Sequence, residues 1–336
     1  MANKSLNKKI NAQWFMDNAI FLVLLALLVL IVVLEPSFLS LKNFTNILSQ
    51  SSTRIIIALG IGGILITGGT DLSAGRCVGL AAVVSASLLQ SADYAYKMYP
   101  DIKELPIIVP ILLVMIIVAI IGILNGFIVA KFNVPPFIVT MGMQIIVYGS
   151  TSIYFDRPPY GAQPIGGLSE NFTQMVIGNT AKIPNLLIFA LIVTAIVWTL
   201  WNKTKFGKNM YAIGGNKEAA VVSGVNVVKG LVLVYMFAGL LYGFAGALEA
   251  GRVGSATNNT GNMYEFDAIA ACVVGGVSLS GGVGTVPGII IGVLIFQVIN
   301  YGLAFIGVNP YLQFIVKGLI IICAVAIDMR KYTKKK

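Results

Sequence analysis

Residues 107–124 read IIVPILLVMIIVAIIGIL, a run of eighteen residues without a charged side chain. That length is close to the roughly 20 apolar residues that an α-helix needs to cross the hydrocarbon core of a bilayer. Three further unbroken runs of this kind occupy Ala19–Leu34, Leu186–Trp201 and Leu231–Leu248. A membrane β-barrel would instead show strands of about ten residues in which apolar and polar residues alternate. The runs therefore predict membrane-spanning helices.

The composition points to the same class. Apolar residues make up 57% of the 336-residue chain and charged residues only 11%. A soluble domain carries about 25% charged residues, so this chain cannot cover a soluble surface. Lys8 and Lys9 precede the first apolar run, as in a secretory signal peptide, but no Ala-x-Ala cleavage site follows it. We expect an all-α polytopic membrane protein, with one transmembrane domain over residues 1–336 and a retained first span.

Apolar runs separated by polar or glycine-rich turns predict about ten transmembrane helices. They lie at 19–34, 45–67, 74–90, 106–131, 137–155, 184–201, 229–250, 263–280, 285–306 and 310–328. Fifteen Lys and Arg residues, Arg76 among them, fall on the side of the two termini, and six fall on the other side. Because cytoplasmic loops carry the excess of Lys and Arg, both termini are predicted to be cytoplasmic.

Cysteine and histidine are too scarce for several kinds of chemistry. Three cysteines and no histidine leave neither a Cys/His metal site nor a nucleophile–histidine pair. Gly207-Lys208 is followed by Asn209, so the phosphate-binding loop G-x-x-x-x-G-K-[ST] is absent. The net charge of +10 favours contact between basic tails and anionic lipid over nucleic-acid binding. We therefore expect this chain to bind no metal, no nucleotide and no nucleic acid.

Ionisable residues flank a glycine-rich junction at 68–75, GGTDLSAG, which is similar to GGVSLSGG at 275–282. The similarity fits an internal repeat, which is common in transporters, and it also fits two unrelated glycine-rich junctions. Charged groups at membrane depth usually serve function, so Asp71, Ser73 and Arg76 are candidate gate residues. In the structural alternative, Asp71 or Ser73 caps the next helix and Arg76 extends to the cytoplasmic headgroups.

A second polar segment, residues 249–267, is predicted to lie at the outer side of the membrane. Its amides and hydroxyls suit hydrogen bonding to neutral polyols. It adds Asn258, Asn259, Glu265 and Asp267 to the candidates for the translocation pathway or gate. An ordinary solvated loop with helix caps is the alternative, and the length of the segment favours a pathway or partner contact.

The most distinctive hydrophilic segment is 202–229, NKTKFGKNMYAIGGNKEAAVVSGVNVVK. It begins with three lysines, turns at 214–216 and continues into a short Ala-rich stretch with high helix propensity. Asn216 is a good N-cap, Glu218 favours the positive start of a helix, and Gly224 is a natural C′ residue. We expect a two-turn helix that presents a smooth docking surface to a cytoplasmic partner; the alternative is a plain amphipathic linker.

Three motifs together carry a family resemblance. TKFGKNMYAIGGNKEAAVVSGV at 204–225 resembles the coupling segment of permeases in ABC sugar importers of the ribose/xylose/galactose group. GGTDLSAGR at 68–76 and AACVVGGVSLSGGVGT at 270–285 resemble the early and late motifs of the same family. RVGSATNN at 252–259 and YEFDAIAACVVGG at 264–276 are most similar to members that import galactose and methyl galactoside. The resemblance covers nearly the whole chain.

The resemblance implies a subunit of an ATP-driven importer in the bacterial inner membrane. Two copies of the permease would form the pathway, and a partner ATPase with two nucleotide-binding domains would hold ATP-Mg, with no cofactor on this chain. A periplasmic galactose-binding protein would deliver the sugar. The coupling loop would be residues 202–228, and its ATPase-coupling residues would be Gly207, Gly214, Gly215, Asn216, Glu218, Ala219, Ala220, Ser223 and Gly224.

Two other classes compete with this interpretation. A self-sufficient secondary sugar transporter would need a coupled ion site, and acidic residues deep in the predicted spans are few. An integral membrane enzyme would need convergent acid/base or metal groups, which the motifs do not provide. We therefore expect no catalytic residue in this chain.

Overall fold

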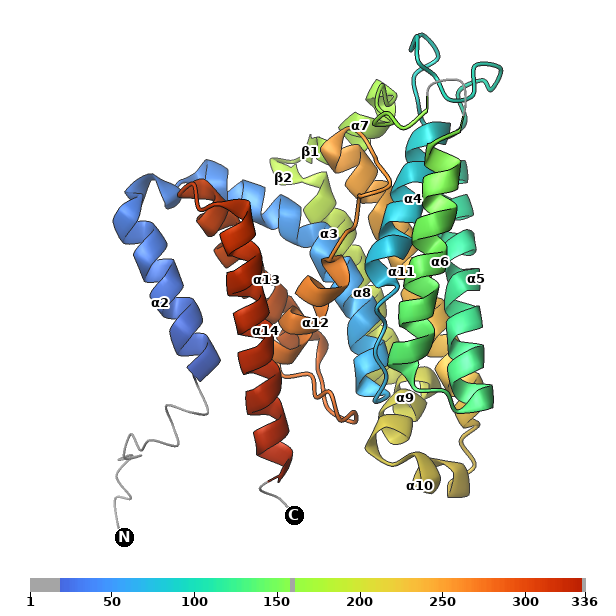
Figure 1. Cartoon of the computed structure of the whole chain (residues 1–336), viewed down its shortest axis with the longest axis vertical. Coiled ribbons are helices and arrows are strands. Elements are labelled where there is room, and N and C mark those ends of the chain that lie inside the picture. The colour runs from blue at the N-terminus through green and yellow to red at the C-terminus, as the bar shows by residue number, and fades with distance from the viewer. Residues whose placement is uncertain (1–18, 158–160, 334–336) are drawn as a thin grey trace.

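The computed structural model describes residues 19–157 and 161–333. Its helices stand roughly side by side, with α2, α13 and α14 on one side of the bundle and α4, α5 and α6 on the other (Figure 1). In chain order the elements are α2 (Ala19–Leu34), the 3-10 helix η1 (Pro36–Phe38), α3 (Leu41–Ile66), α4 (Ala74–Leu88), α5 (Ile108–Phe132), α6 (Pro136–Phe155), α7 (Glu170–Ile177), β1 (Asn179–Thr180), β2 (Ile183–Pro184), α8 (Asn185–Lys203), α9 (Lys205–Gly215), α10 (Lys217–Val222), α11 (Val227–Val253), α12 (Tyr264–Val274), α13 (Val286–Phe305) and α14 (Pro310–Thr333).

The all-α architecture predicted from the apolar runs is confirmed for the described residues. The only strands there, β1 and β2, form a two-residue antiparallel hairpin. Six helices are long and apolar enough to cross a membrane by themselves: α3, α5, α6, α8, α11 and α13. Shorter apolar stretches lie in α2, α4 and α14. The basic residues Lys4, Lys8, Lys9, Lys334, Lys335 and Lys336, which contributed to the predicted orientation, lie outside the described residues.

The predicted span at 263–280 is wrong. Its helix, α12, has only eleven residues, which at 1.5 Å per residue gives about 16 Å, half of the roughly 30 Å of a hydrocarbon core. The rest of that stretch is a loop that leads to Thr285, the N-cap of α13. Glycines end α12: Gly275 is its C-cap, and Gly276 follows with a φ of 86°, a conformation that favours glycine.

Two helices are preceded by non-helical chain inside the bundle. Residues 67–73 separate α3 from α4, and residues 254–263 separate α11 from α12. In Figure 1 the first segment rises from the lower end of α3 to the start of α4, and the second descends from the upper end of α11 to the start of α12. The two shortened helices therefore begin part-way along the bundle, from opposite directions.

The most extensive contact between two helices is that of α5 with α11, where glycines let the two backbones meet. A Cβ atom added at Gly239 would lie 2.4 Å from the carbonyl oxygen of Val118, and one at Gly122 would lie 2.2 Å from that of Tyr235. Small residues at helix contacts are the usual means of close packing in membranes. The glycines of these two helices therefore let α5 and α11 pack backbone against backbone.

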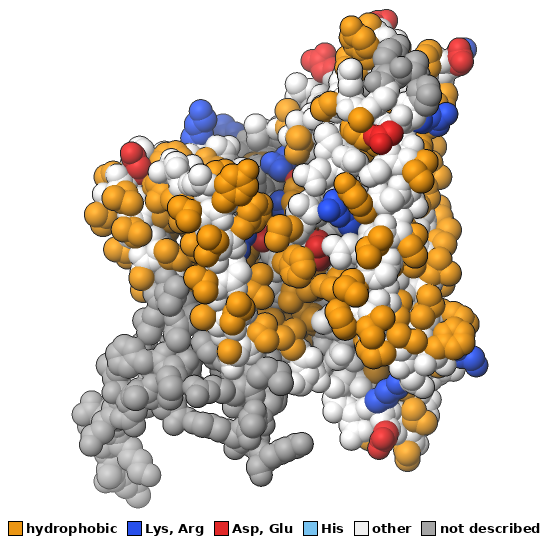
Figure 2. Space-filling model, in the orientation of Figure 1, with side chains coloured by type: hydrophobic (Ala, Val, Ile, Leu, Met, Phe, Trp, Pro, Cys, Tyr) orange, Lys and Arg blue, Asp and Glu red, His pale blue; other side chains and the backbone are white. Residues whose placement is uncertain are grey.

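The outer faces of α5, α6 and α8 are apolar and exposed. Ile116, Ile145, Ile153 and Leu191 are among the large hydrophobic side chains exposed on these helices. Figure 2 shows apolar side chains over most of the visible flank of the molecule, with charged groups at its two ends and in a central hollow. This distribution suits helices that face lipid.

We expect Gly239→Ala to destabilise the protein, because the added methyl group would collide with the backbone of α5. Overpacking of this kind typically costs about 1–3 kcal/mol. Gly149→Ala on α6 is the matched control, since a Cβ there would meet nothing within 4 Å. The measurement is the thermal unfolding midpoint of both variants in detergent; equal midpoints would contradict the importance of this contact.

Candidate functional site

The hydrophilic segment 202–229 forms two helices instead of the single helix predicted. The helix at its C-terminal end, α10, has the predicted caps: Asn216 accepts a hydrogen bond from the backbone N–H of Ala219 at 2.8 Å. Gly224 has a φ of 81°, and Val225 N–H reaches back to the Ala220 carbonyl oxygen, as in a Schellman motif. The additional helix, α9, was missed because its glycines favoured a turn over a helix.

The glycines of α9 pack against the chain itself. A Cβ at Gly207 would lie 1.9 Å from the carbonyl oxygen of Trp201 at the end of α8. A Cβ at Gly214 would lie 1.7 Å from the carbonyl oxygen of Ile66 and 2.7 Å from the nitrogen of Gly282. These two predicted coupling residues therefore belong to the inner face of the segment, which rests on the transmembrane helices.

The two similar glycine-rich motifs, residues 68–75 and 275–282, meet beside Gly214. Gly282 N–H donates to the Ile66 carbonyl oxygen at 2.8 Å. A Cβ at Gly281 would lie 2.9 Å from the nitrogen of Gly68, and the Tyr211 hydroxyl donates to the Gly284 carbonyl oxygen at 2.8 Å. We call this contact between the end of α3, the 280–284 loop and α9 the inner junction. α9 is therefore in direct contact with both membrane segments.

Ala220 does not have the exposed position that the sequence suggested. Its side chain is only 3% exposed and packs with Ala130, Ile213, Val227 and Leu231. A helix of six residues must turn one face inward, and position 220 is on that face. The side chain of Ala220 therefore anchors α10 and cannot itself contact a partner in this conformation.

The outer face of α10 is fully accessible. The exposed predicted coupling residues are Gly215, Asn216, Glu218, Ala219, Ser223 and Gly224. Sequence reasoning missed Val221 and Val222 as part of this face, although Val222 is 89% exposed. Two exposed valines in an otherwise hydrophilic segment were the available signal. α10 lies at one end of the molecule (Figure 1), and its outer face presents the two exposed valines bordered by polar residues.

Asp71 and Ser73 are buried together in the segment before α4. The Asp71 carboxylate accepts hydrogen bonds from the Ser73 backbone N–H at 2.9 Å and from its hydroxyl at 2.6 Å. Asn125 of α5 donates to the Ser73 hydroxyl oxygen at 3.1 Å. The Tyr242 hydroxyl of α11 faces the same carboxyl group without a hydrogen bond of suitable geometry.

The predicted capping of α4 takes a different form. Ser73 is the residue before α4, but its side chain makes no capping hydrogen bond to the helix. The carboxylate of Asp71 bonds to Ser73 itself, so it orders the segment that leads into the helix. Asn125 and Tyr242 were missed, and each is a polar residue inside a long apolar run.

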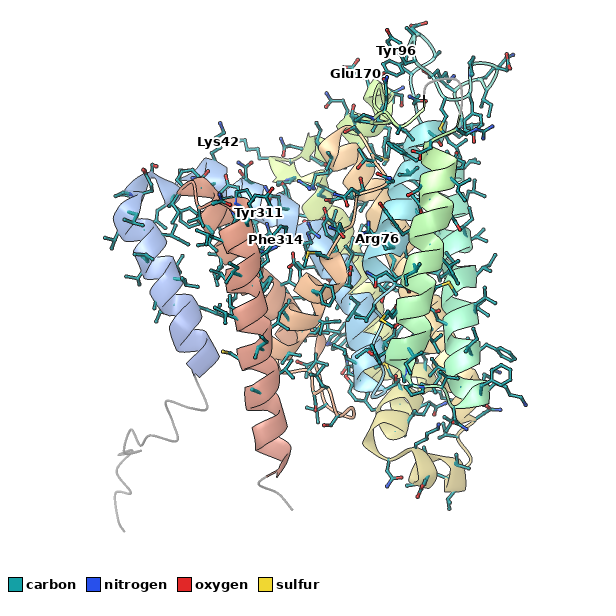
Figure 3. The ribbon with its side chains drawn as sticks, in the orientation of Figure 1. Lys42, Arg76, Tyr96, Glu170, Tyr311 and Phe314 are labelled. Atoms are coloured by element: carbon teal, nitrogen blue, oxygen red, sulfur yellow. The ribbon has the colours of Figure 1, made fainter. Side chains whose placement is uncertain are left out.

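The structural alternative for Arg76, in which its side chain extends to the cytoplasmic headgroups, is wrong. Its guanidinium group donates to the Asn262 side-chain oxygen at 2.7 Å and to the Asn258 carbonyl oxygen at 3.4 Å. It also lies over the ring of Tyr148 at 4.3 Å from the ring centroid. Figure 3 shows Arg76 near mid-height of the bundle, between α14 and α6. Because it lies at membrane depth, Arg76 does not belong with the cytoplasmic charges.

Glu265 is buried where the two interrupted segments meet. Its Oε1 atom accepts from Gln144 of α6 at 3.0 Å, and its Oε2 atom has no hydrogen-bond partner. A Cβ at Gly75 would fall 2.0 Å from that Oε2 atom and 2.4 Å from the Gly261 carbonyl oxygen. Glycine at position 75 is therefore what lets α4 approach the start of α12. The polar segments around 67–76 and 257–265 thus form one site, which we call the central junction.

The remaining candidates lie apart from one another. The Asn258 side chain donates to the Ser152 hydroxyl oxygen at 3.2 Å, beside the Arg76 contact. Asn259 is exposed, and its backbone N–H is bound by Thr257. Asp267 faces α14, where its carboxylate forms an ion pair with Lys317 at 3.1 Å. Asp267 therefore lines a polar cavity whose walls do not include Asp71 or Glu265.

A buried ionic cluster near the upper end of α11 escaped the sequence analysis as a site. Glu249 is fully buried and forms a two-bond ion pair with Arg252, at 2.7 and 2.9 Å. It also accepts from the hydroxyl groups of Thr53 and Tyr264, at 2.9 and 2.7 Å. The guanidinium group of Arg54 stacks on the Tyr264 ring, 3.1 Å from its centroid. The sequence signal for this cluster was Glu249, a single acidic residue inside an apolar span.

No group of three metal-ligating side chains occurs among residues 19–157 and 161–333. Cys77 and Cys272 are buried and unpaired, and Cys323 is exposed. Hydrogen-bonding groups and ion pairs thus make up the sites that the described residues form.

Comparison with known proteins agrees with this architecture. The family model described as "Branched-chain amino acid transport system / permease component" matches residues 43–325. The galactose/methyl galactoside import permease protein MglC of Haemophilus influenzae is 58% identical and aligns over 99% of each chain, and the protein of the same name in Escherichia coli is 57% identical over the same shares. The ribose import permease protein RbsC of Escherichia coli is 36% identical over 95% of each chain. No solved structure matches the chain. The chain therefore belongs to this family of multi-pass membrane permeases, whose members are transport components and not enzymes.

Proposed function

We propose that this chain is the permease subunit of an ATP-driven importer for galactose and methyl galactoside in the bacterial inner membrane. Two full-length relatives that are 57–58% identical carry that substrate in their names. The ribose permeases are more distant, at 36–38% identity. A second copy of the chain, an ATPase with two nucleotide-binding domains and a periplasmic galactose-binding protein complete the proposed complex.

The inner junction is the observation that best supports coupling to an ATPase. The α9–α10 segment has an outer face that no other part of the described chain covers, and an inner face in backbone contact with two membrane segments. A partner that pushes on Val221, Val222 and Ala219 would move α9 as a rigid body. Through Gly214 that motion would reach the ends of α3 and the 280–284 loop, as alternating access requires.

The central junction supports a polar pathway. Asp71, Arg76 and Glu265 come from segments that interrupt the helices, and such interruptions mark substrate pathways in transporters. They interact with amide and hydroxyl side chains and not with a chain of titrating groups. We infer that they gate the pathway by arranging the interrupted segments, while the ATPase supplies the energy.

The proposed topology has ten membrane-associated helices, with α12 as a partial one, and cytoplasmic termini. Five lysines lie in or beside α9 and α10, which supports a cytoplasmic position for this end: Lys203, Lys205, Lys208, Lys217 and Lys229. The loops around α7 and the β1–β2 hairpin lie at the opposite end (Figure 1). That end would receive the binding protein.

Reconstituted transport tests both the function and the orientation. Proteoliposomes containing the permease and its ATPase should take up galactose when ATP is inside and sugar-loaded binding protein is outside. Only transporters whose α10 faces the lumen should be active under these conditions. Omitting the ATPase should abolish uptake, and an imposed proton or sodium gradient should not restore it. Gradient-driven uptake by the permease alone would identify a secondary transporter instead.

The two neighbouring alanines of α10 provide a matched pair for the coupling surface. We expect Ala219→Trp to leave the protein folded and to reduce ATPase binding and uptake about thirtyfold or more, since a blocked central contact costs roughly 2–4 kcal/mol. Ala220→Trp should instead lower the thermal unfolding midpoint, because the indole cannot fit against Ala130 and Leu231. The measurements are co-purification of the ATPase, uptake and the unfolding midpoint. Normal ATPase binding by the Ala219→Trp protein would show that the partner docks elsewhere.

Substitutions at Asp71 separate a hydrogen-bonding role from a role of the charge. Asparagine keeps an oxygen that can accept both bonds from Ser73, whereas leucine keeps none. We expect Asp71→Asn to retain most uptake and Asp71→Leu to lose about tenfold or more, because a buried donor left unpaired costs about 1–3 kcal/mol. Initial uptake rates at equal membrane expression provide the measurement. Equal loss in both variants would assign the essential role to the charge.

A further inference from the structure

A second polar cavity lies outside the central junction, between α3, α12, α13 and α14. It has a volume of about 430 Å³. The polar side chains that line it are Gln50, Arg54, Asp267, Gln297, Asn300 and Lys317. Figure 2 shows charged side chains in the hollow at the middle of the visible face, and in Figure 3 Tyr311 and Phe314 of α14 lie on one side of that hollow, with Arg76 on the other.

The cavity offers both donors and acceptors that have no partner within the described chain. Gln297 donates to Gln50 at 2.9 Å, which leaves the amide nitrogen of Gln50 and the amide oxygen of Gln297 available. One terminal nitrogen of Arg54 is buried without a hydrogen bond. Asn300 makes no side-chain hydrogen bond with the described residues, although it lines the cavity. A hydroxyl group both donates and accepts, so this mixture suits a ligand with several hydroxyl groups.

One wall of the cavity is aromatic and held in place. The rings of Tyr301 and Phe305 stack with centroids 6.2 Å apart and planes 20° apart. The Tyr301 hydroxyl is already engaged, because it donates to Asn43 at 2.8 Å and accepts from Asn46 at 3.2 Å. The two rings therefore contribute apolar surface to the lining of the cavity. A monosaccharide has an apolar face of C–H groups surrounded by hydroxyl groups, so this aromatic wall suits such a ligand.

One cationic group of the cavity has no ion-pair partner. Asp267 and Lys317 form an ion pair at 3.1 Å, and the buried Glu249 is paired with Arg252. Arg54 stacks on Tyr264 and makes no ion pair with a described residue, so its guanidinium group can donate hydrogen bonds to the hydroxyl oxygens of a neutral ligand. The volume also lies within the range of about 300–1,000 Å³ that is usual for small-molecule sites.

The cavity lies toward the end of α3 that is opposite the inner junction. Tyr301 binds Asn43 and Asn46 near the start of α3, whereas Ile66 at its other end contacts Gly214. Under the topology proposed above, this is the outer half of the membrane. A ligand arriving from outside would therefore meet this cavity before the inner junction.

We propose that this cavity is a monosaccharide-binding site within a single permease chain, built by Gln50, Arg54, Gln297 and Asn300 around the Tyr301–Phe305 wall. The proposal rests on the proposed function for the identity of the sugar. Galactose released at the outer face would occupy the site before it passes between the halves of the transporter. The ion pair of Asp267 with Lys317 connects α12 to α14 beside the ligand, so occupancy of the site would also be sensed by α12.

The first test is transport by variants that replace hydrogen-bonding groups with apolar ones. In the complete complex in proteoliposomes, Asn300→Leu and Gln297→Leu should each lower galactose uptake about tenfold, the loss expected for one or two hydrogen bonds to the ligand. ATP hydrolysis stimulated by the binding protein should stay within about twofold, because the coupling surface is intact. Ser150→Leu is the control, since Ser150 is exposed on α6 and binds only its own helix.

The second test measures occupancy without transport. In a Cys323→Ala background, where the remaining cysteines are buried, Asn300→Cys is labelled with a thiol reagent in the assembled complex. Saturating galactose should slow the labelling about fivefold or more, whereas mannitol at the same concentration should not.

The outcomes separate this proposal from the proposed function. If the unaltered complex imports no galactose, the proposed function is wrong, and galactose is no longer the expected ligand of this cavity. If the unaltered complex imports galactose and both leucine variants do so at the same rate, the site is overturned alone. Protection of the cysteine by galacturonate but not by galactose would also overturn it, in favour of an anion site.

Discussion

A helix that begins part-way across a bilayer leaves backbone N–H groups without partners, and lipid cannot supply any. This constraint explains much of the polar chemistry in the bundle. The N–H groups of Leu72 and Ser73, ahead of α4, are bound by the Thr140 hydroxyl and the Asp71 carboxylate. Ahead of α12, the N–H of Thr257 is bound by the Thr260 hydroxyl. Of these side chains, Asp71 is also a candidate gate residue, so a structural role and a proposed functional role coincide at that position.

Glycine has a complementary part, because it lets these interrupted segments touch. Gly75 meets the carbonyl oxygen of Gly261, and Gly214 meets the carbonyl oxygen of Ile66 and the nitrogen of Gly282, so both contacts join backbone to backbone. Contacts of this kind are stiff, since no flexible side chain lies between the two backbones. In the proposed mechanism, such a contact would pass a displacement of α9 directly to the membrane segments. The same property makes these positions sensitive to the addition of one methyl group.

α3 connects the two ends of the proposed mechanism. Its outer part contributes Gln50 and Arg54 to the polar cavity, and its last residue, Ile66, accepts the hydrogen bond from Gly282 at the inner junction. Most of the helix between these points is fully buried. A buried helix packed on all sides moves as a rod, which offers a physical route between sugar occupancy at one end and the ATPase contact at the other.

The sequence by itself determined the class of the protein, the positions of nine of the helices and the caps of α10. These are local properties: an apolar run of sufficient length must be helical in lipid, and Asn216 and Gly224 act on backbone groups within a few residues. The family resemblance through the segment at 204–225 is likewise a property of contiguous sequence. What only the tertiary structure decided is which residues meet across the bundle. Periodicity could not show that α12 stops after eleven residues, that Arg76 turns to Asn262 instead of lipid headgroups, or that Ala220 faces inward while Ala219 faces out. It also could not place Asp267 beside Lys317, fifty positions away. Those facts depend on how close the backbones approach and on which buried polar groups find partners, and both are set by the packing of all helices together.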